Sequence, residues 1–494
     1  MPRKSVLPIL LVLTALWLGW AGWSWFTGRA SYTLMVMDET GAPLVDVAVA
    51  RGDEVIATTG PDGTVALDGR HEGDLLVLAA AGYNPVKVTV PDPSAEMVEA
   101  MLEPTVLRAR VVDHEGRPVE GARVSAGDRW AVTGLDGRAM VQHAESGRVV
   151  VERPAWSGSE HVWDGGPGEL TASVEPLVVR AVHVAVDVAR DPALWEGFVR
   201  MAEETELNGI MLDLKAEEGI VYYDSQVELA RRIDAVDPLF NLAEIARQLG
   251  ELDLYLIGRI VAFQDPVAAR RAPELAVWSA REDAPYQRNN QYFLDPTDPA
   301  ARGYALDLAE EVCRLGVDEV QFDYVRFPDG YPEWAVFDGD IAPGSEYQDA
   351  RVAALKGFLQ DARDRLHPLG CAVAGDVFGF VTTATDDGGI GQEWVEMTKA
   401  LDVVSPMLYP SHYASGWWGF ADPNDHPREV VRYALRDGLD RLESGTVIRP
   451  WLQDFGYTPA QVRAQIDATE EFGFGWMLWN AKSNVSVEAL RPGR

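Results

Sequence analysis

Val317-Asp-Glu-Val-Gln-Phe-Asp-Tyr-Val-Arg-Phe-Pro328 has the pattern of one buried β-strand that ends in polar groups. Apolar Val320 and Phe322 alternate with polar Gln321 and Asp323, which is the two-residue period of a strand. The final proline ends the strand, because it cannot donate a hydrogen bond to a neighbour. An aspartate at the carboxyl end of an apolar strand costs free energy unless it is paired or functional. We therefore predict that Asp323 lies at the bottom of a binding cleft.

From residue 178 onward, apolar strand candidates alternate with amphipathic helix candidates. The strand candidates are 179–188, 209–216, 254–263, 317–327, 371–380, 403–413, 447–455 and 474–480. The helix candidates are 192–206, 240–252, 300–315, 347–366, 393–401, 427–442 and 459–472. This alternation predicts an α/β fold, a TIM or (β/α)8 barrel, over residues 178–494. A doubly wound open sheet is the alternative, but its usual glycine-rich phosphate-binding turn is missing after the first strand.

Residues 31–104 and 105–177 form an imperfect repeat. Val36-Met-Asp-Glu-Thr-Gly-Ala-Pro43 corresponds to Val111-Val-Asp-His-Glu-Gly-Arg-Pro118, and a Thr-Gly-x-Asp-Gly turn follows in each copy. Short β-branched runs between such turns predict two antiparallel, all-β sandwich modules. These modules resemble the carboxypeptidase-regulatory-like, or transthyretin-like, domains of many exported proteins. We expect them to act as spacers, with ligand or partner binding as the alternative, because neither shows an aromatic row or an obvious apolar face.

Residues 1–30 contain an apolar segment that follows Arg3 and Lys4. Its length of about 21 residues is enough to cross a membrane as a helix. Several tryptophans crowd its far end, where indole rings favour the membrane interface. We predict a transmembrane signal anchor in the cell membrane, with the bulk of the chain extracytoplasmic. A cleaved signal peptide, which would secrete the chain, is the alternative.

The chain has 494 residues and a net charge of −34, from 77 acidic and 43 basic residues. This length predicts several domains rather than one core. The acidic balance argues against nucleic acid as a partner, because phosphate binding needs basic patches, and it disfavours strongly anionic polymers. Cys313 and Cys371 lack the spacing of metal ligands and are predicted to be core residues, with a disulfide between them left open.

Polar and aromatic residues occur at the carboxyl ends of all eight predicted strands, where (β/α)8 barrels hold their active sites. One such residue would normally be part of a buried structural pair, whereas contributions from every strand indicate a polar ligand. The predicted substrate-binding set is Asp187, Asp213, Lys215, Arg259, Arg326, Tyr409, His412, Asp454, Trp479 and Asn480. Loop aromatics add candidate stacking surfaces for sugar rings: Tyr222, Tyr223, Tyr286, Tyr292, Trp417 and Trp418.

The motifs of several other enzyme classes are absent from the sequence. There is no H-x-H or H-E-x-x-H cluster for a metal, and no Gly-x-Ser-x-Gly elbow for a serine hydrolase. No Gly-x-Gly-x-x-Gly follows a strand, so no dinucleotide site is indicated. We therefore expect neither a metal nor a cofactor. Acid/base chemistry by carboxylates is what remains, and glycoside hydrolysis is its standard example.

Seven short segments of the barrel region carry a family resemblance. They are GIMLDLK (209–215), GRIVAF (258–263), QFDYVRFP (321–328), GDVFG (375–379), SPMLYPSHY (405–413), PWLQD (450–454) and GWMLWN (475–480). Together they resemble a glycoside hydrolase family of bacterial membrane-associated proteins that is distantly similar to α-amylase-type barrels. The resemblance implies a (β/α)8 barrel and, as an expectation, the cleavage of a polysaccharide or oligosaccharide.

Two carboxylates are predicted to be catalytic. Asp323 is the predicted nucleophile, or the stabiliser of an oxocarbenium-like transition state, with Arg326 as a nearby positive charge. Asp376, on the adjacent strand, is the predicted acid that protonates the leaving oxygen, and Asp454 and Asp213 are the alternatives.

Other interpretations of these residues stay open at this point. The acids could instead form buried ion pairs, Asp213 with Lys215 or Arg259 and Asp323 with Arg326. A barrel that binds an envelope glycan without cleaving it is the functional alternative. A scaffold for an envelope complex is a third interpretation, in which the β-modules would carry the important surface.

Overall fold

The computed structural model describes residues 31–494, except 69–72, 74, 91–96, 340, 444 and 494. The predicted transmembrane segment, residues 1–30, lies outside the described residues. No helix in the described part is both long and apolar enough to span a membrane. The chain divides into two compact units, Met1–Glu152 with Gly158–Val174 and Arg153–Ser157 with Glu175–Arg494.

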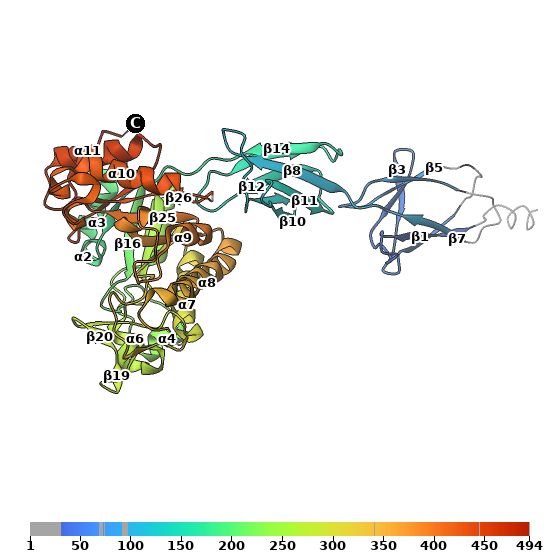
Figure 1. Cartoon of the computed structure of the whole chain (residues 1–494). Helices are drawn as coiled ribbons and strands as arrows, with labels where there is room; N and C mark the ends of the chain where they lie inside the picture. The colour runs from blue at the N-terminus through green and yellow to red at the C-terminus, as the bar shows by residue number, and fades with distance from the viewer. Residues whose placement is uncertain are drawn as a thin grey trace, which may run out of the picture. The chain divides into compact units, whose positions relative to one another are not determined.

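The first unit contains two β-modules with the same strand order. Each has one sheet of three strands and one of four, β4-β1-β7 with β3-β2-β5-β6, then β11-β8-β14 with β10-β9-β12-β13 (Figure 1). The strands are β1 (Tyr32–Met37), β2 (Ala48–Arg51), β3 (Glu54–Thr58), β4 (Thr64–Leu67), β5 (Leu75–Ala79), β6 (Val86–Thr89), β7 (Met97–Met101), β8 (Val106–Val112), β9 (Arg123–Ala126), β10 (Arg129–Val132), β11 (Arg138–Gln142), β12 (Gly147–Glu152), β13 (Ser159–Trp163) and β14 (Glu169–Ser173). The predicted pair of sandwich-like modules is confirmed, although β1 with β7 and β8 with β14 pair in parallel.

The repeated aspartates build the same turn in both modules. Asp38 Oδ1 accepts hydrogen bonds from the backbone N–H groups of Thr40 and Ala42, at 2.8 and 2.9 Å. Asp113 Oδ1 accepts the equivalent bonds from Glu115 and Arg117, both at 2.9 Å. An aspartate that bonds to the backbone two and four residues later stabilises a tight turn. The sequence repeat is therefore a repeat of turn chemistry as well as of strands.

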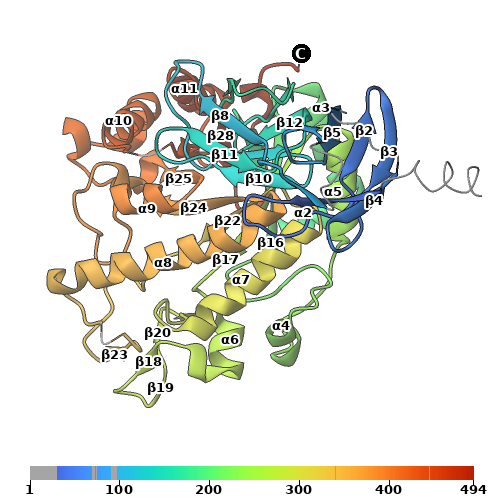
Figure 2. The ribbon, with the colours of Figure 1, turned by 90° about the vertical axis from the view of Figure 1, so that its right-hand side faces the viewer.

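The second unit contains a closed barrel of eight parallel strand positions (Figure 2). In chain order the strands are β15 (Arg180–Val184), β16 (Gly209–Lys215), β17 (Tyr255–Val261), β22 (Glu319–Asp323), β24 (Ala372–Phe378), β25 (Val403–Leu408), β26 (Val447–Ile448) with β27 (Trp451–Gln453), and β28 (Trp476–Trp479). Pairing of β24 with β25 and of β15 with β28 closes the ring, so the alternative of an open sheet is wrong. The seventh position is split around Pro450, which has no N–H group to donate.

The helices predicted between the strands are all present. They are α3 (Pro192–Glu204), α5 (Leu242–Glu251), α7 (Pro299–Arg314), α8 (Gln348–Leu366), α9 (Trp394–Ala400), α10 (Pro427–Asp440) and α11 (Pro459–Glu470). Asp191 and Asp298 cap α3 and α7, and each cap precedes a proline in the first turn, a favourable start for a helix. Several strand ends are wrong. The first strand ends at Val184, the fourth at Asp323 and the sixth at Leu408, each before its predicted end. Residues 186–189 form the short helix α2 (Val186–Ala189) instead.

Side chains of β22 explain how the barrel carries its site. Val320 and Phe322 belong to the core between the strands and the surrounding helices. Glu319, Gln321 and Asp323 alternate with them and contact residues of other barrel strands. Because side chains alternate along a strand, this second set faces the barrel interior. Asp323, the last residue of β22, therefore lies at the carboxyl end of the barrel.

Cys313 of α7 and Cys371, just before β24, form a disulfide bond with Cα atoms 5.9 Å apart. The structure thus settles the possibility that the sequence left open. The bond closes a loop between residues 58 apart in sequence and ties a covering helix to the barrel.

Reduction of this disulfide is expected to lower the free energy of unfolding of the barrel by about 2–4 kcal/mol, because the bond restricts the unfolded chain. Denaturant unfolding with and without reductant measures the change, and a Cys313→Ser/Cys371→Ser double variant should match the reduced protein. Equal midpoints for the oxidised and reduced protein would contradict the expectation.

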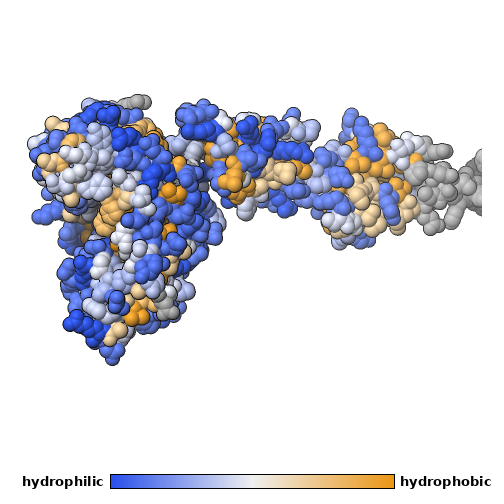
Figure 3. Space-filling view, viewed as in Figure 1, coloured by the Kyte–Doolittle hydropathy of each residue, from blue (hydrophilic) through white to orange (hydrophobic). Residues whose placement is uncertain are grey.

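Several exposed side chains of the second β-module are apolar, and Figure 3 shows apolar residues on the visible surface of both modules. They include Trp130, Val132, Leu135, Met140 and Val162. Arg123 lies over the ring of Trp130, 4.8 Å from its centroid. The sequence pattern did not predict this exposed apolar surface.

Candidate active site

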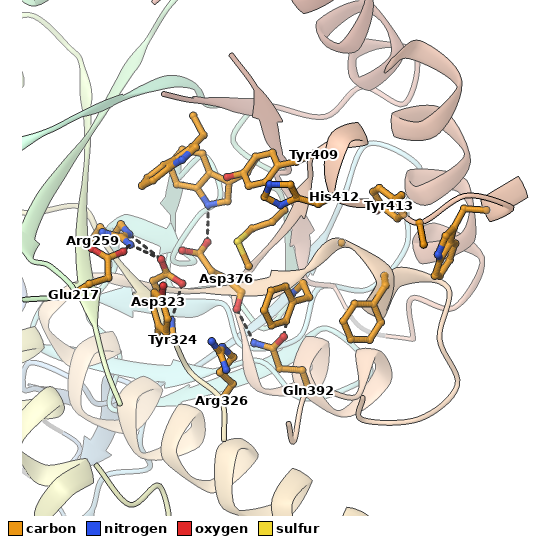
Figure 4. Close-up of a pocket in the computed structure, with 18 residues that line it drawn as sticks. Glu217, Arg259, Asp323, Tyr324, Arg326, Asp376, Gln392, Tyr409, His412 and Tyr413 are labelled. Atoms are coloured by element: carbon orange, nitrogen blue, oxygen red, sulfur yellow. Dashed lines mark hydrogen bonds and ion pairs between the residues drawn. The ribbon is translucent and has the colours of Figure 1, made fainter. Parts of the chain in front are cut away.

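A cavity of about 410 Å³ lies at the carboxyl end of the barrel, where the sequence placed the site (Figure 4). Both predicted catalytic carboxyls line it. Its wall comes from strand ends and from the loops after them: Glu217, Arg259, Asp323, Tyr324, Arg326, Asp376, Phe378, Gly379, Phe380, Gln392, Met407, Tyr409, His412, Tyr413, Ala414, Trp417, Trp451 and Trp479.

Arg259 of β17 holds three carboxylates together. Its Nε and Nη2 atoms lie 3.0 and 2.5 Å from Oδ2 of Asp323, and its Nη1 atom lies 2.8 Å from Oδ1 of Asp213. Nη2 also contacts Glu217. The expected ion pair of Asp213 with Arg259 is confirmed, whereas the pair of Asp323 with Arg326 is wrong. The ionic partner of Asp323 comes from the neighbouring strand rather than from the same one.

Asp213 is fixed from its other side by His183. Nε2 of His183 lies 2.8 Å from Oδ2 of Asp213, and its Nδ1 lies 2.9 Å from the carbonyl oxygen of Asn480. Burial by itself raises the pKa of Asp213, but the charges and hydrogen bonds of His183 and Arg259 outweigh burial and hold this pKa well below its usual value. Asp213 is therefore a counter-ion for Arg259 and is poorly suited to be the alternative acid.

Asp376 of β24 has the opposite environment. It is 2% exposed, and its Oδ1 atom accepts hydrogen bonds from Nε1 of Trp451 at 2.7 Å and from Nε2 of Gln321 at 2.5 Å. Burial, and then the negative charge of Asp323, raise the pKa of Asp376 well above its usual value. One carboxyl of the cavity thus favours its protonated form, while the other is paired with a guanidinium group. A carboxyl whose pKa is raised by burial is suited to act as an acid.

The backbone beside Asp323 is strained. Tyr324 has a φ of 50°, in the left-handed region that a bulky residue rarely adopts. Its N–H group lies 2.6 Å from Oδ1 of Asp323, so both carboxylate oxygens of this residue accept hydrogen bonds. Strain of this kind concentrates at functional sites, where the surrounding structure maintains it.

A comparison with known protein families identifies the family of the barrel. Residues 181–485 match a family described as "Putative glycosyl hydrolase domain". The chain belongs to this family. The match confirms the resemblance of the barrel region to a glycoside hydrolase family. A search of curated proteins finds no match.

Solved structures with a similar fold include three bacterial proteins. The glycoside hydrolase domain of PgaB (BpsB) from Bordetella bronchiseptica is 17% identical, with 62% of this chain and 95% of that chain covered and a TM-score of 0.46. The glycoside hydrolase domain of PelA from Pseudomonas aeruginosa is 12% identical, with coverages of 62% and 96% and a TM-score of 0.37. A hypothetical protein from Ruminiclostridium thermocellum ATCC 27405 is 29% identical, with coverages of 40% and 97% and a TM-score of 0.35.

Seven of the twelve predicted site residues and one of the six predicted loop aromatics line this cavity. Those in its wall are Arg259, Asp323, Arg326, Asp376, Tyr409, His412 and Trp479, together with the loop residue Trp417. Asp213 lies behind the wall, in contact with Arg259.

Besides Asp213, four other predicted binding residues are not among the lining residues. The side chain of Asp187 is 77% exposed on α2 and pairs with Arg190, because the first strand ends before it. Lys215 is buried, with its Nζ atom 3.0 Å from Oδ2 of Asp265 rather than paired with Asp213. Asp454 is buried and accepts a hydrogen bond from the N–H group of Ser486 at 2.9 Å.

Asn480 stabilises a turn after β28. Its Nδ2 atom donates to the carbonyl oxygen of Asp454 at 2.6 Å, and its Oδ1 atom accepts from the N–H groups of Lys482 and Asn484 at 3.0 and 3.2 Å. Because these bonds use the side-chain amide of Asn480, this residue stabilises the turn rather than the cavity wall.

Several lining residues were missed by the sequence analysis. Glu217 continues the alternation of Asp213 and Lys215 beyond the end of β16, and this parity could have identified it. Gln392 lies in a loop and gave no such signal. Its Nε2 atom lies 3.0 Å from the carbonyl oxygen of Asp376, and its Oε1 accepts from the N–H group of Phe378 at 3.0 Å. Gln392 thus holds the backbone on which the buried acid sits.

The described part of the chain was also searched for groups of side chains that could bind a metal ion. No group of three or more His, Cys, Asp or Glu residues there has an arrangement that could hold a metal ion.

Proposed function

We propose that the barrel hydrolyses glycosidic bonds of a polysaccharide or oligosaccharide, with Asp376 as the general acid and Asp323 as the nucleophile or transition-state stabiliser. The observation that carries the proposal is the pair itself. Two carboxyl groups line one cavity, one with a pKa raised by its environment and one paired with Arg259. Glycoside hydrolysis needs one carboxylic acid and one carboxylate.

The hydrogen bonds of Asp376 suit a group that gives up a proton. Trp451 and Gln321 both donate to Oδ1, and such bonds favour the carboxylate that is left after the proton has moved to the leaving oxygen. Burial opposes ionisation before the reaction, while these donors stabilise the product of the transfer. Asp323, held by Arg259, faces the positive charge that develops on the sugar in an oxocarbenium-like transition state.

The cavity wall also suits a sugar ring. Phe378, Tyr409, Trp417 and Trp479 are among the lining residues, and flat aromatic rings offer apolar surface to the C–H face of a pyranose. Carboxylates and guanidinium groups on the same wall can bind hydroxyl groups. This combination of apolar walls and a few polar groups is typical of small-molecule binding sites.

We also propose that the chain is anchored in the cell membrane by residues 1–30 and works outside the cytoplasm. The apolar N-terminal segment supports the anchor, and the disulfide Cys313–Cys371 supports an oxidising compartment. In this proposal the modules of residues 31–104 and 105–177 separate the barrel from the membrane. Membrane fractionation of the full chain and of a variant that lacks residues 1–30 tests it, because only the full chain should sediment with the membrane.

Release of product from a panel of dye-labelled polysaccharides tests the activity. The wild-type chain is compared with an Asp323→Asn/Asp376→Asn double variant, which serves as the blank. We expect release by the wild type alone. If the wild type binds a glycan on an array but releases no product during long incubation, the barrel is a glycan-binding protein and the proposal fails.

Hydrolysis is expected to decrease as the pH rises through the raised pKa of Asp376, because the acid must be protonated to act. The activity should therefore persist well above pH 4, at which an ordinary aspartic acid, with a pKa of about 3.9, is half ionised. A pH profile of kcat/KM measures this alkaline limb.

Two variants test whether Asp376 causes the alkaline limb of the pH profile. Trp451→Phe removes a hydrogen bond that favours the carboxylate, so the pKa rises further and the limb should move to higher pH. Asp376→Asn should eliminate the limb on a substrate whose leaving group needs no proton. An unchanged limb in both variants would show that another group is the acid.

A further inference from the structure

Arg326 is a buried cation without a carboxylate partner in the described part of the chain. It follows β22, lines the cavity and is 9% exposed. Its hydrogen bond runs from Nη1 to the carbonyl oxygen of Phe327, at 3.1 Å. No ion pair within 4.0 Å joins it to any described carboxylate, whereas the buried Arg351 and Arg449 pair with Asp387 and Glu319.

Aromatic rings surround the guanidinium group instead. The Cζ atom lies 5.0 Å from the ring centroid of Tyr324, 5.2 Å from that of Phe378 and 5.8 Å from that of Phe293. Cation–π contacts of this kind offset part of the cost of burial. They leave Nε and Nη2 without a hydrogen-bond partner among the described residues. Figure 4 shows the guanidinium group directed toward the cavity, between Tyr324 and Gln392.

The cavity wall contains two arginines, Arg259 and Arg326, although the whole chain has a net charge of −34. Arg259 is already neutralised by its contacts with Asp213, Glu217 and Asp323. Arg326 is the lining arginine that forms no ion pair within 4.0 Å with a described carboxylate. A buried cation without a counter-ion costs free energy, and an anionic ligand that reaches it recovers that cost.

We propose that Arg326 binds a carboxylate of the substrate, and hence that the glycan contains uronic acid residues. A planar guanidinium group with one free edge can donate two parallel hydrogen bonds to a carboxylate. The sugar ring would rest against Phe378, whose ring stacks on Phe380 at 5.8 Å. The inference rests on the proposed function of this cavity as a glycan site. Because the overall charge repels densely anionic polymers, the fitting substrate carries acidic sugars interspersed with neutral ones.

The test uses tetrasaccharides in which glucuronic or galacturonic acid alternates with a neutral sugar. Each is paired with a counterpart whose carboxyl groups have been reduced to hydroxymethyl groups. Binding to the full chain with Asp323→Asn, which prevents turnover, is measured by titration calorimetry. We expect an acidic member to bind about 10- to 100-fold more tightly than its reduced partner, as a charge-assisted pair should.

Variants assign that difference to Arg326. In Arg326→Gln the acidic and reduced members should bind alike, and Arg326→Lys should retain part of the preference. Arg270→Gln is the matched control, because Arg270 also stacks on an aromatic ring, Tyr292 at 4.5 Å, but is exposed and does not line the cavity. Its preference should equal that of the parent.

Three results would overturn the inference: equal binding of acidic and reduced members, no binding of any acidic member, or a preference for sulfated neutral tetrasaccharides over the uronates. Turnover by the wild type separates this proposal from the previous one. Selective binding of a uronate that is never cleaved would leave the role of Arg326 in place and refute hydrolysis. Cleavage of neutral glycans without any preference for acidic ones would support hydrolysis and refute the role of Arg326.

Discussion

Asp323→Asn is expected to lower kcat/KM on a cleaved glycan by at least about 1,000-fold while the barrel stays folded. Asparagine has nearly the same shape and can still accept a hydrogen bond from Arg259. It cannot supply the negative charge that a nucleophile, or an oxocarbenium-like transition state, requires. The loss should therefore be in kcat, with the binding of the same glycan little changed in a calorimetric titration.

Glu319→Gln provides the matched control on the same strand. Glu319 is buried at the other end of β22, where it pairs with Arg449 instead of lining the cavity. Its replacement also removes one buried negative charge and should lower the stability. We expect kcat/KM per folded molecule to stay within about twofold of wild type, because nothing in the cavity changes. Undiminished turnover by Asp323→Asn, or equal losses in both variants, would contradict the role of Asp323.

The barrel could be predicted because its signals are local. Each strand is an apolar run that ends at a turn or a proline. Each helix repeats its apolar residues with a helical period, which the flanking strands do not share. Eight repetitions of this alternation leave few other folds. The error at the first strand has the same origin. Val184, Val186 and Val188 continue the two-residue alternation of β15, but the chain turns into α2 after Val184.

The site could be predicted only in part, because its pairing is not local. The alternation of side chains along each strand was enough to predict that Asp213, Arg259, Asp323 and Asp376 converge inside the barrel. Arg326 was predicted to pair with Asp323 because the two residues are close in sequence. In the barrel, the neighbouring strand β17 places Arg259 beside Asp323 instead. A contact between residues 64 apart in sequence has no short-range signal.

The two arginines of the cavity also differ in what holds them. Arg259 is enclosed by carboxylates and belongs to the fold as much as to the site. Arg326 is enclosed by rings and has a free edge toward the cavity. The first is therefore expected to be important for stability, and the second for the choice of ligand.

Arg259→Ala is expected to lower the free energy of unfolding of the barrel by about 3–5 kcal/mol, because it leaves buried carboxylates without their counter-ion. Asp323 and Glu217 lose their contacts with Arg259, and Asp213 keeps only its contact with His183. Denaturant unfolding of the full chain at neutral pH, monitored by a probe in the barrel, measures the loss. The folded fraction should also be inactive, since Asp323 is no longer held in place.

The pH dependence of that loss identifies its cause. In the wild type the depressed pKa of Asp213 contributes stability that is present above its unfolded pKa and is lost as the pH falls through the folded pKa. Without Arg259 this depression is weaker, so the deficit of the variant should be largest at neutral pH and should shrink below about pH 4. Arg449→Ala, which breaks the buried pair with Glu319 at the opposite end of β22, should also destabilise the barrel but leave its folded fraction active. A deficit of Arg259→Ala that does not change with pH, or an equal loss of activity in both variants, would show that Arg259 does not act by neutralising these carboxylates.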